Sequence, residues 1–102
     1  MKNAIITAAA AFAVAQLTMP VHAQEALAKS KGCLACHTTS SKLIGPPYKD
    51  VSAKYKGDKE ANAKLQASVL KGSQGKYGPI PMPPNKVTEE EAKALVAWIL
   101  TL

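Results

Sequence analysis

The residues best suited to chemistry stand together in one pentapeptide, Cys33-Leu34-Ala35-Cys36-His37. In a helical turn, side chains three and four residues apart are neighbours, so both thiols and the imidazole can face one partner. Two such thiols can form thioether bonds with the vinyl groups of one porphyrin while the imidazole binds its iron. Cys-x-x-Cys-His is the attachment signature of a c-type haem. The pattern therefore predicts one covalently attached haem c, with Cys33 and Cys36 as anchors and His37 as an axial ligand.

Other functions of a Cys-x-x-Cys pair stay open at this point. The two cysteines could form a disulfide, act as a redox dithiol or supply half of a zinc site. A copper or zinc protein that uses Cys33, Cys36, His37 and Met82 is a further alternative, but a thioether is a poor zinc ligand. The histidine directly after the second cysteine, in a chain with an export segment, favours the haem.

The first 23 residues have the composition of a secretory signal. Lys2 gives a positively charged start, residues 4–17 are an apolar stretch, and a small-x-small-like cleavage site ends at Ala23. A membrane anchor is the alternative, but the apolar run is short for a span and is followed by a proline. The sequence thus predicts a signal peptide at 1–23 that is cleaved after Ala23, and a periplasmic domain at 24–102.

Removal of this segment simplifies the assignment of iron ligands. Residues 24–102 are 79 of the 102 residues and retain one of the two histidines and one of the three methionines. Isolated methionines usually fill gaps in a core. Met82, however, lies between Pro81 and Pro83, 45 residues after His37, and these prolines give it the stiff mount that a ligand requires. We therefore expect Met82 to be the second axial ligand, which raises the potential of a haem.

Size and charge restrict the classes of partner. A domain of this size has a marginal core of its own, so a porphyrin would add apolar surface to pack against. The chain has 13 basic and 7 acidic side chains, a net charge of +6, and every basic residue is lysine. Without arginine, a basic run or a series of stacking aromatic residues, nucleic-acid binding is not expected. The positive charge suits redox proteins with acidic docking surfaces.

Periodicity and turn residues predict an all-α fold, a small single domain whose helices wrap around the covalently bound haem. The clearest helix follows Thr88, which is spaced from Glu91 as a capping box. Segments 40–47 and 72–85 are predicted loops, because their glycines and prolines cannot continue a helix. The remaining helices are expected over Gln24–Lys31, over Asp50–Tyr55, and from an N-cap at Asp58 to Lys71.

The two axial ligands separate an electron carrier from an enzyme. An electron carrier needs a closed, six-coordinate iron, whereas a haem enzyme needs an open distal position with acid or base groups nearby. Residues 24–102 contain no second histidine and no arginine for such chemistry. A one-electron carrier without enzymatic activity is therefore predicted. The alternative is a haem enzyme or ligand-binding haem protein in which Met82 is displaced.

Four segments resemble the class I cytochromes c, in particular the small bacterial cytochrome c-551/c-552 family: KGCLACH, IGPPYKDVSAKY, KGSQGKYGPIPMPPN and EEEAKALVAWIL. The resemblance covers residues 24–102. It implies a helical fold in which the N- and C-terminal helices cross. It also implies a soluble periplasmic shuttle that serves respiration or denitrification, for example by supplying a nitrite reductase or a terminal oxidase. A monomer is the expected state of such a shuttle.

By position, the resemblance repeats the assignment of the anchors and axial ligands and adds supporting residues. It implies that the carbonyl of Pro46 orients His37, and that Asn85 lies by the sulfur of Met82 and influences its geometry. An apolar patch at the haem edge, ringed by lysines, is implied as well. Its residues would be Leu34, Leu43, Ile44 and Ile80, with lysines such as Lys31 and Lys42.

Two positions depart from the family pattern. Relatives commonly have tryptophan where this chain has Tyr77, and often arginine where it has Ser68, and both side chains are directed at a haem propionate. A tyrosine hydroxyl can still donate a hydrogen bond, whereas a serine is short and uncharged. The propionate contacts of this chain are therefore expected to differ from those of its relatives.

Overall fold

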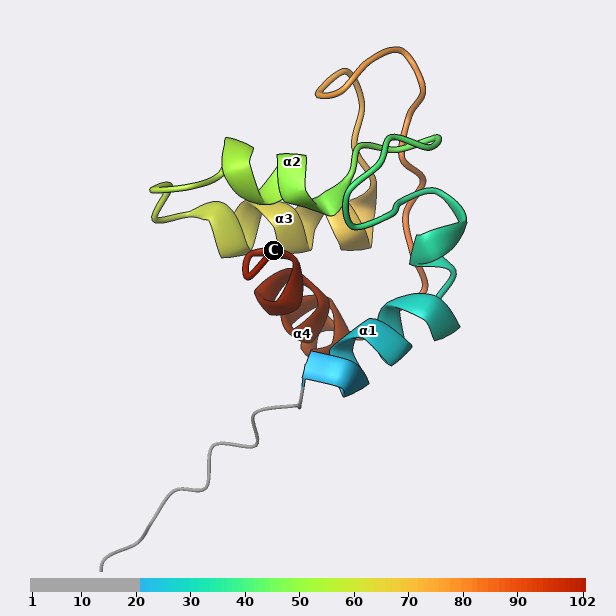
Figure 1. The fold of residues 1–102 in the computed structure, drawn as a ribbon, viewed down its shortest axis with the longest axis vertical. Coiled ribbons are helices and arrows are strands. Elements are labelled where there is room, and N and C mark those ends of the chain that lie inside the picture. Colours follow the sequence, from blue (N-terminus) through green and yellow to red (C-terminus); the bar gives the residue numbers. More distant parts are fainter. Residues whose placement is uncertain (1–20) are drawn as a thin grey trace, which may run out of the picture.

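The computed structural model describes residues 21–102, which form four α-helices and one 3₁₀ turn (Figure 1). Within these residues the one β-type pairing is an isolated antiparallel bridge between Ser73 and Met82. The predicted all-α fold is confirmed. None of the described helices is long and apolar enough to cross a membrane. In chain order the elements are α1 (Val21–Ser30), the 3₁₀ turn η1 (Cys33–Ala35), α2 (Tyr48–Lys54), α3 (Ala61–Lys71) and α4 (Glu89–Ile99).

Helix α1 begins earlier than expected. It starts at Val21 rather than at Gln24 and runs through the predicted cleavage position after Ala23. Residues 1–20 of the predicted signal peptide lie outside the described residues. The side-chain amide of Gln24 donates a hydrogen bond to the carbonyl of Ala94 in α4 at 3.2 Å. The first residue of the predicted mature domain is therefore tied to the last helix.

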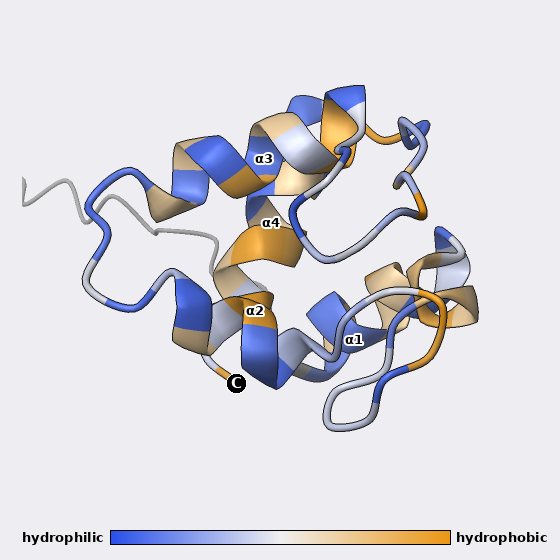
Figure 2. Ribbon diagram, turned by 90° about the horizontal axis from the view of Figure 1, so that it is seen from above, coloured by the Kyte–Doolittle hydropathy of each residue, from blue (hydrophilic) through white to orange (hydrophobic). Residues whose placement is uncertain are grey.

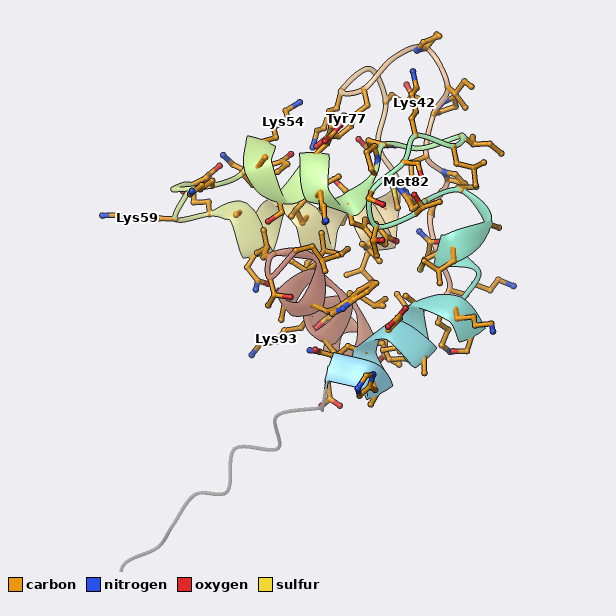
Figure 3. All side chains as sticks on the ribbon, in the orientation of Figure 1. Lys42, Lys54, Lys59, Tyr77, Met82 and Lys93 are labelled. Carbon is orange, nitrogen blue, oxygen red and sulfur yellow. The ribbon has the colours of Figure 1, made fainter. Side chains whose placement is uncertain are left out.

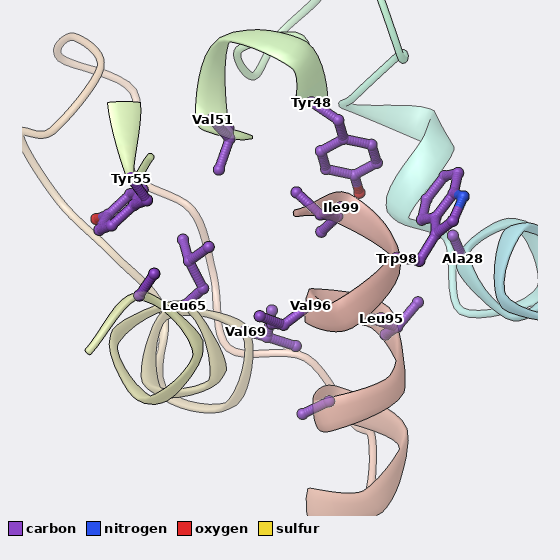
Figure 4. Close-up of a cluster of buried hydrophobic side chains, with 12 residues drawn as sticks. Ala28, Tyr48, Val51, Tyr55, Leu65, Val69, Leu95, Val96, Trp98 and Ile99 are labelled. Atoms are coloured by element: carbon purple, nitrogen blue, oxygen red, sulfur yellow. The ribbon is translucent and has the colours of Figure 1, made fainter. Parts of the chain in front are cut away.

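Helix α4 lies at the centre of the fold and packs against α1, α2 and α3 (Figure 1). It begins with the predicted capping box. The hydroxyl of Thr88 accepts from the N–H of Glu91 at 3.1 Å, and the carboxylate of Glu91 accepts from the N–H of Thr88 at 2.9 Å. The buried face of α4 supplies much of the core, shown in Figure 4, through Ala92, Leu95, Val96, Trp98 and Ile99.

Helix α2 starts at Tyr48, two residues before the expected start, because Pro47 takes the N-cap position with φ −64° and ψ 144°. Proline fixes φ near the helical value and is well tolerated at the start of a helix. The helix buries Tyr48 and Val51. Figure 2 shows hydrophilic and hydrophobic stretches alternating along α2 and α3, as expected for helices with one buried face.

The prediction of Asp58 as the N-cap of α3 is wrong, because Glu60 occupies that position. The carboxylate of Asp58 instead accepts hydrogen bonds from the N–H of Glu60 and from the ammonium of Lys64, both at 2.8 Å. Aspartate often forms such a local turn in competition with a helix cap. The end of α3 is as predicted, since Gly72 stops the helix with φ 85° and its N–H donates to the carbonyl of Ser68.

The long segment between α3 and α4 is not helical, as predicted, and it folds back on itself. The N–H of Ser73 donates to the carbonyl of Met82 at 3.0 Å, and the N–H of Met82 donates to the carbonyl of Ser73 at 2.8 Å. These two bonds close a loop over residues 74–81, which Figure 1 shows extending above α2 and α3. The loop therefore returns Met82 to the end of α3.

Candidate haem site

One cavity of about 460 Å³ lies between the two long loops and the buried faces of the helices. Its volume falls in the range of about 300–1,000 Å³ that is usual for small-molecule and cofactor sites. Core side chains of α3 and α4, including Leu65, Val69 and Ile99, give it an apolar lining. The structure brings every site residue predicted from the sequence to the lining of this cavity: Cys33, Cys36, His37, Pro46, Tyr77, Met82 and Asn85.

The turn η1 brings the cysteines and the histidine to the cavity. The N–H groups of Cys36 and His37 both donate to the carbonyl of Cys33, at 3.2 and 3.0 Å. Both thiols are free. Burial raises the pKa of the Cys33 thiol, whereas a reactive dithiol needs a lowered thiol pKa. This environment argues against the redox-dithiol alternative.

The imidazole of His37 is held by the segment that leads into α2. Its Nδ1 lies 2.8 Å from the carbonyl oxygen of Pro46, which is the contact expected from the sequence. Because a carbonyl can only accept, Nδ1 carries the proton and Nε2 keeps a lone pair for a metal. The ring of Tyr48 stacks on the imidazole, with centroids 4.8 Å apart and planes 17° from parallel. Tyr48 in turn packs edge-to-face with Trp98, with the ring centroids 5.5 Å apart.

Gly45 allows this segment to lie close to the imidazole. A Cβ atom at Gly45 would come within 2.5 Å of His37 Cε1, 2.8 Å of Nδ1 and 3.0 Å of Nε2. The N–H of Gly45 also donates to the carbonyl of Cys36 at 2.7 Å. Sequence reasoning missed the roles of Gly45 and Tyr48. The run Gly-Pro-Pro-Tyr that starts eight residues after His37 is the available signal.

Met82 is partly buried and packs against the core. A Cβ atom at Gly72 would lie 2.7 Å from the Met82 carbonyl oxygen, so a glycine is required for the backbone to approach there. The φ of 85° and ψ of 173° at Gly72 are also accessible essentially to glycine alone. Beyond Met82, the side-chain amide and the N–H of Asn85 both donate to the carbonyl of Val69 at 3.0 Å. The methionine is thus fixed on both sides in the chain.

Tyr77 and Ser68 both line the cavity, and each contacts a lysine. The ammonium of Lys54 lies 4.4 Å from the centroid of the Tyr77 ring, and Figure 3 shows the two side chains next to each other above α2. Burial raises the pKa of Tyr77 to about 12, so its hydroxyl is a neutral donor at physiological pH. The hydroxyl of Ser68 accepts a hydrogen bond from Lys76 at 3.3 Å.

The predicted apolar patch is present only in part. Leu43, Ile44 and Ile80 have exposed fractions of 50, 56 and 65%, and all three line the cavity. Their exposed surface therefore belongs to the cavity and its rim. Leu34 differs, because it is partly buried and packs against the core.

These residues fit a haem c. The two free thiols have the spacing for thioether attachment, the imidazole and the thioether can ligate iron, and the apolar lining suits a porphyrin. Among residues 21–102, no group of three or more His, Cys, Asp or Glu side chains is arranged to hold a metal ion by itself.

Comparison with known proteins gives the family. The family model described as cytochrome c matches residues 22–102. The chain belongs to the cytochrome c family. This cytochrome c is 52% identical over 77 residues to cytochrome c-551 of Pseudomonas aeruginosa, a match that covers 76% of the chain and 74% of that protein. It is 48% identical over 90 residues to cytochrome c-552 of Hydrogenobacter thermophilus, which covers 88% of the chain and 92% of that protein.

The solved structures agree with this assignment. The crystal structure of cytochrome c552 from Nitrosomonas europaea matches with a TM-score of 0.75 and 47% identity, over 76% of this chain and 98% of that chain. The predicted resemblance to the small bacterial c-551/c-552 cytochromes is therefore confirmed. This cytochrome c carries one covalently attached haem c and is a monohaem electron carrier.

Proposed function

We propose that this cytochrome c is a soluble, monomeric periplasmic shuttle without enzymatic activity, which passes single electrons between respiratory or denitrification partners such as a nitrite reductase or a terminal oxidase. The observation that carries the proposal is the presence of His37, Met82, Cys33 and Cys36 on one cavity lining. A haem held there supplies an iron that alternates between two oxidation states. If the His37 imidazole and the Met82 thioether both bound this iron, no coordination position would be left for a substrate.

The residues around His37 support this role by fixing the imidazole. Pro46 holds the proton on Nδ1 through a 2.8 Å contact, and Tyr48 stacks on the ring. The close approach of Gly45 leaves the ring little room on that side. A ligand held by three contacts in this way changes position little when the charge at the site changes. Small rearrangement favours fast electron transfer in both directions.

Met82 is assigned as the second axial ligand. Its backbone N–H and carbonyl both form hydrogen bonds with the backbone of Ser73, and the prolines on either side restrict its backbone. Asn85 is tied to α3 directly after this segment and lines the same cavity, which supports its assignment as the residue that influences the Met82 sulfur. Bound to a haem iron, the soft thioether of Met82 would favour the less charged ferrous state and so raise the potential.

Replacement of Met82 by alanine tests the shuttle against the ligand-binding alternative. The substitution should lower the midpoint potential and open the iron to cyanide or imidazole, because the sixth ligand is lost. Ile80→Ala, in the same loop and also on the cavity lining, is the control and should bind neither. An unchanged potential in Met82→Ala would contradict the assignment. Tight cyanide binding by the unsubstituted protein would favour a haem enzyme or ligand-binding protein instead.

The docking surface is proposed to be the cavity rim around Leu43, Ile44 and Ile80. Lys42 lies on the same rim, so it is placed to attract an acidic partner. Lys31 is paired with Glu91 at 3.3 Å, which offsets part of its charge. The rate of electron transfer to an acidic redox partner should fall as salt is added, because salt screens exposed charges. A rate that does not change with salt would show that the lysines do not contribute to docking.

Export is proposed from residues 1–23, with a mature domain over 24–102. The Gln24–Ala94 hydrogen bond supports this boundary, because cleavage after Ala23 would leave this contact between the first mature residue and α4 intact. N-terminal sequencing of the haem-containing protein from a periplasmic extract should begin at Gln24 or within a residue or two of it. Haem protein that still begins at Met1 would contradict the proposal.

A further inference from the structure

The loop over residues 74–81 is attached to α2 and α3 by two lysine side chains. Lys54, the last residue of α2, donates from Nζ to the carbonyl of Lys76 at 3.3 Å and lies over the ring of Tyr77. The side chain of Lys76 itself contacts the other helix, since its Nζ donates to the hydroxyl of Ser68 in α3, also at 3.3 Å. The two contacts hold this loop between α2 and α3.

Neither ammonium group has a carboxylate partner among the described residues. The ion pairs found within residues 21–102 involve other lysines. Lys54 and Lys76 use a carbonyl, an aromatic ring and a hydroxyl, all of which are neutral. A charged donor forms much stronger hydrogen bonds with a carboxylate than with such neutral acceptors. The two positive charges are therefore available to an anion that enters the cavity.

Lys76 is placed to meet such an anion, because it lines the haem cavity together with Ser68 and Tyr77. The other charged or titratable groups along this part of the lining are Lys42 from the loop before α2, Asp50 from α2, and Tyr55 directly after α2. Asp50 is the one carboxylate among the lining residues, so the lysines outnumber it even before Lys54 is included. The local charge is positive.

The position of these lysines matches the chemistry of the cofactor. A haem that is attached through its former vinyl groups carries its two propionate carboxylates at the opposite edge of the ring. Lys76 lies in the loop after α3 and is hydrogen-bonded to Ser68 of α3, and Figure 3 shows Lys54 and Tyr77 above α2. The η1 turn with the two cysteines instead packs against α1. Lys76 thus occupies a part of the cavity lining that the attachment turn does not form.

We propose that the Lys76 ammonium, held by Ser68 and by the contacts of Lys54 to the same loop, binds a haem propionate and offsets its negative charge. The inference rests on the haem site of the proposed function. A cation within hydrogen-bonding distance lowers the pKa of a carboxylate by about 1 to 3 units, so the propionate stays ionised at neutral pH. Without the cation, its uncompensated charge would stabilise the ferric state.

The variant Lys76→Gln tests the proposal in the holoprotein. Glutamine keeps a donor for Ser68 but removes the charge. The midpoint potential at neutral pH and low salt should fall, and the affinity of the propionate for a proton should rise about tenfold or more. The pH dependence of the potential and an NMR titration of the propionate measure the two effects. Ser68→Ala should change both in the same direction by a smaller amount, since it removes only the acceptor that positions Lys76.

Lys59→Gln is the matched control, because it removes the same charge from an exposed residue that is not on the cavity lining and whose side chain extends outward from the loop between α2 and α3 (Figure 3). It should leave the propionate titration unchanged. Equal potentials and equal propionate titrations in Lys76→Gln and Lys59→Gln would overturn the inference while leaving the haem site intact. Absence of covalent haem from the unsubstituted protein would overturn the proposed function, and this inference with it.

Discussion

Replacement of Gly45 by alanine should displace the imidazole of His37. The added Cβ atom would lie 2.5 Å from His37 Cε1, whereas unstrained carbon atoms stay about 3.5 Å apart, so the ring must retreat by about 1 Å. That movement lengthens or tilts the 2.8 Å contact from Nδ1 to Pro46 and disturbs the stack on Tyr48. Overpacking of this kind costs about 2 kcal/mol. In a domain of this size, the melting temperature should fall by about 8–16 °C.

The assay combines thermal unfolding, followed by circular dichroism, with electron paramagnetic resonance of the ferric haem. Gly57→Ala is the control, because Gly57 has φ 81° and no atom within 4 Å of the added Cβ. That variant should lose about 1 kcal/mol from backbone strain alone and keep an unchanged haem signal. Gly45→Ala should alter both the stability and the haem signal. If its haem signal and melting temperature match those of the unsubstituted protein, the argument that Gly45 holds the imidazole in place is refuted.

Three further substitutions and one control test the packing and capping of α4. Leu95→Ala should lower the free energy of unfolding by about 3 kcal/mol in a denaturant titration, because Leu95 is 2% exposed. The control Lys93→Ala, at an exposed position of the same helix, should change it by less than about 0.5 kcal/mol. Similar losses in both variants would contradict the assignment of the buried face. Thr88→Ala should cost about 1 kcal/mol through the lost cap, and no loss would argue against the capping box. Hydrogen bonds from the N–H of Thr88 and, to a smaller extent, from Lys31 hold the pKa of Glu91 below its ordinary value of 4.5. Ionised Glu91 therefore stabilises the fold above about pH 4.5, and this stabilisation is lost as the pH falls through the lowered pKa of the folded state. The stability difference between the unsubstituted protein and Glu91→Gln should thus shrink in acid, and a difference that stays constant from neutral pH to pH 3 would contradict this.

Local signals in the sequence were sufficient for much of the fold and for the composition of the site. The order of two cysteines and a histidine predicts a function because the chemistry depends on adjacent residues in one turn. The capping box at Thr88 and the stop at Gly72 are also local, and both are present. The position of Met82 was predictable because proline restricts the backbone whatever the tertiary structure.

The partner that a side chain takes among several available ones was not predictable in this way. The residue type of Asp58 suits a helix cap, but its carboxylate instead accepts the N–H of Glu60 in a competing turn. The stack of Tyr48 on the imidazole depends on how the loop before α2 returns to the η1 turn. The contact between Lys76 and Ser68 joins a flexible surface residue to a neighbouring helix, and no periodicity or motif encodes it.

The most direct test of the account is a denaturing mass spectrum of the protein from a periplasmic extract, recorded after treatment with a thiol-alkylating reagent. We predict the mass of residues 24–102 plus one haem, with neither Cys33 nor Cys36 alkylated. The mass of the bare chain with two alkylated thiols would contradict the central claim that both cysteines hold the haem.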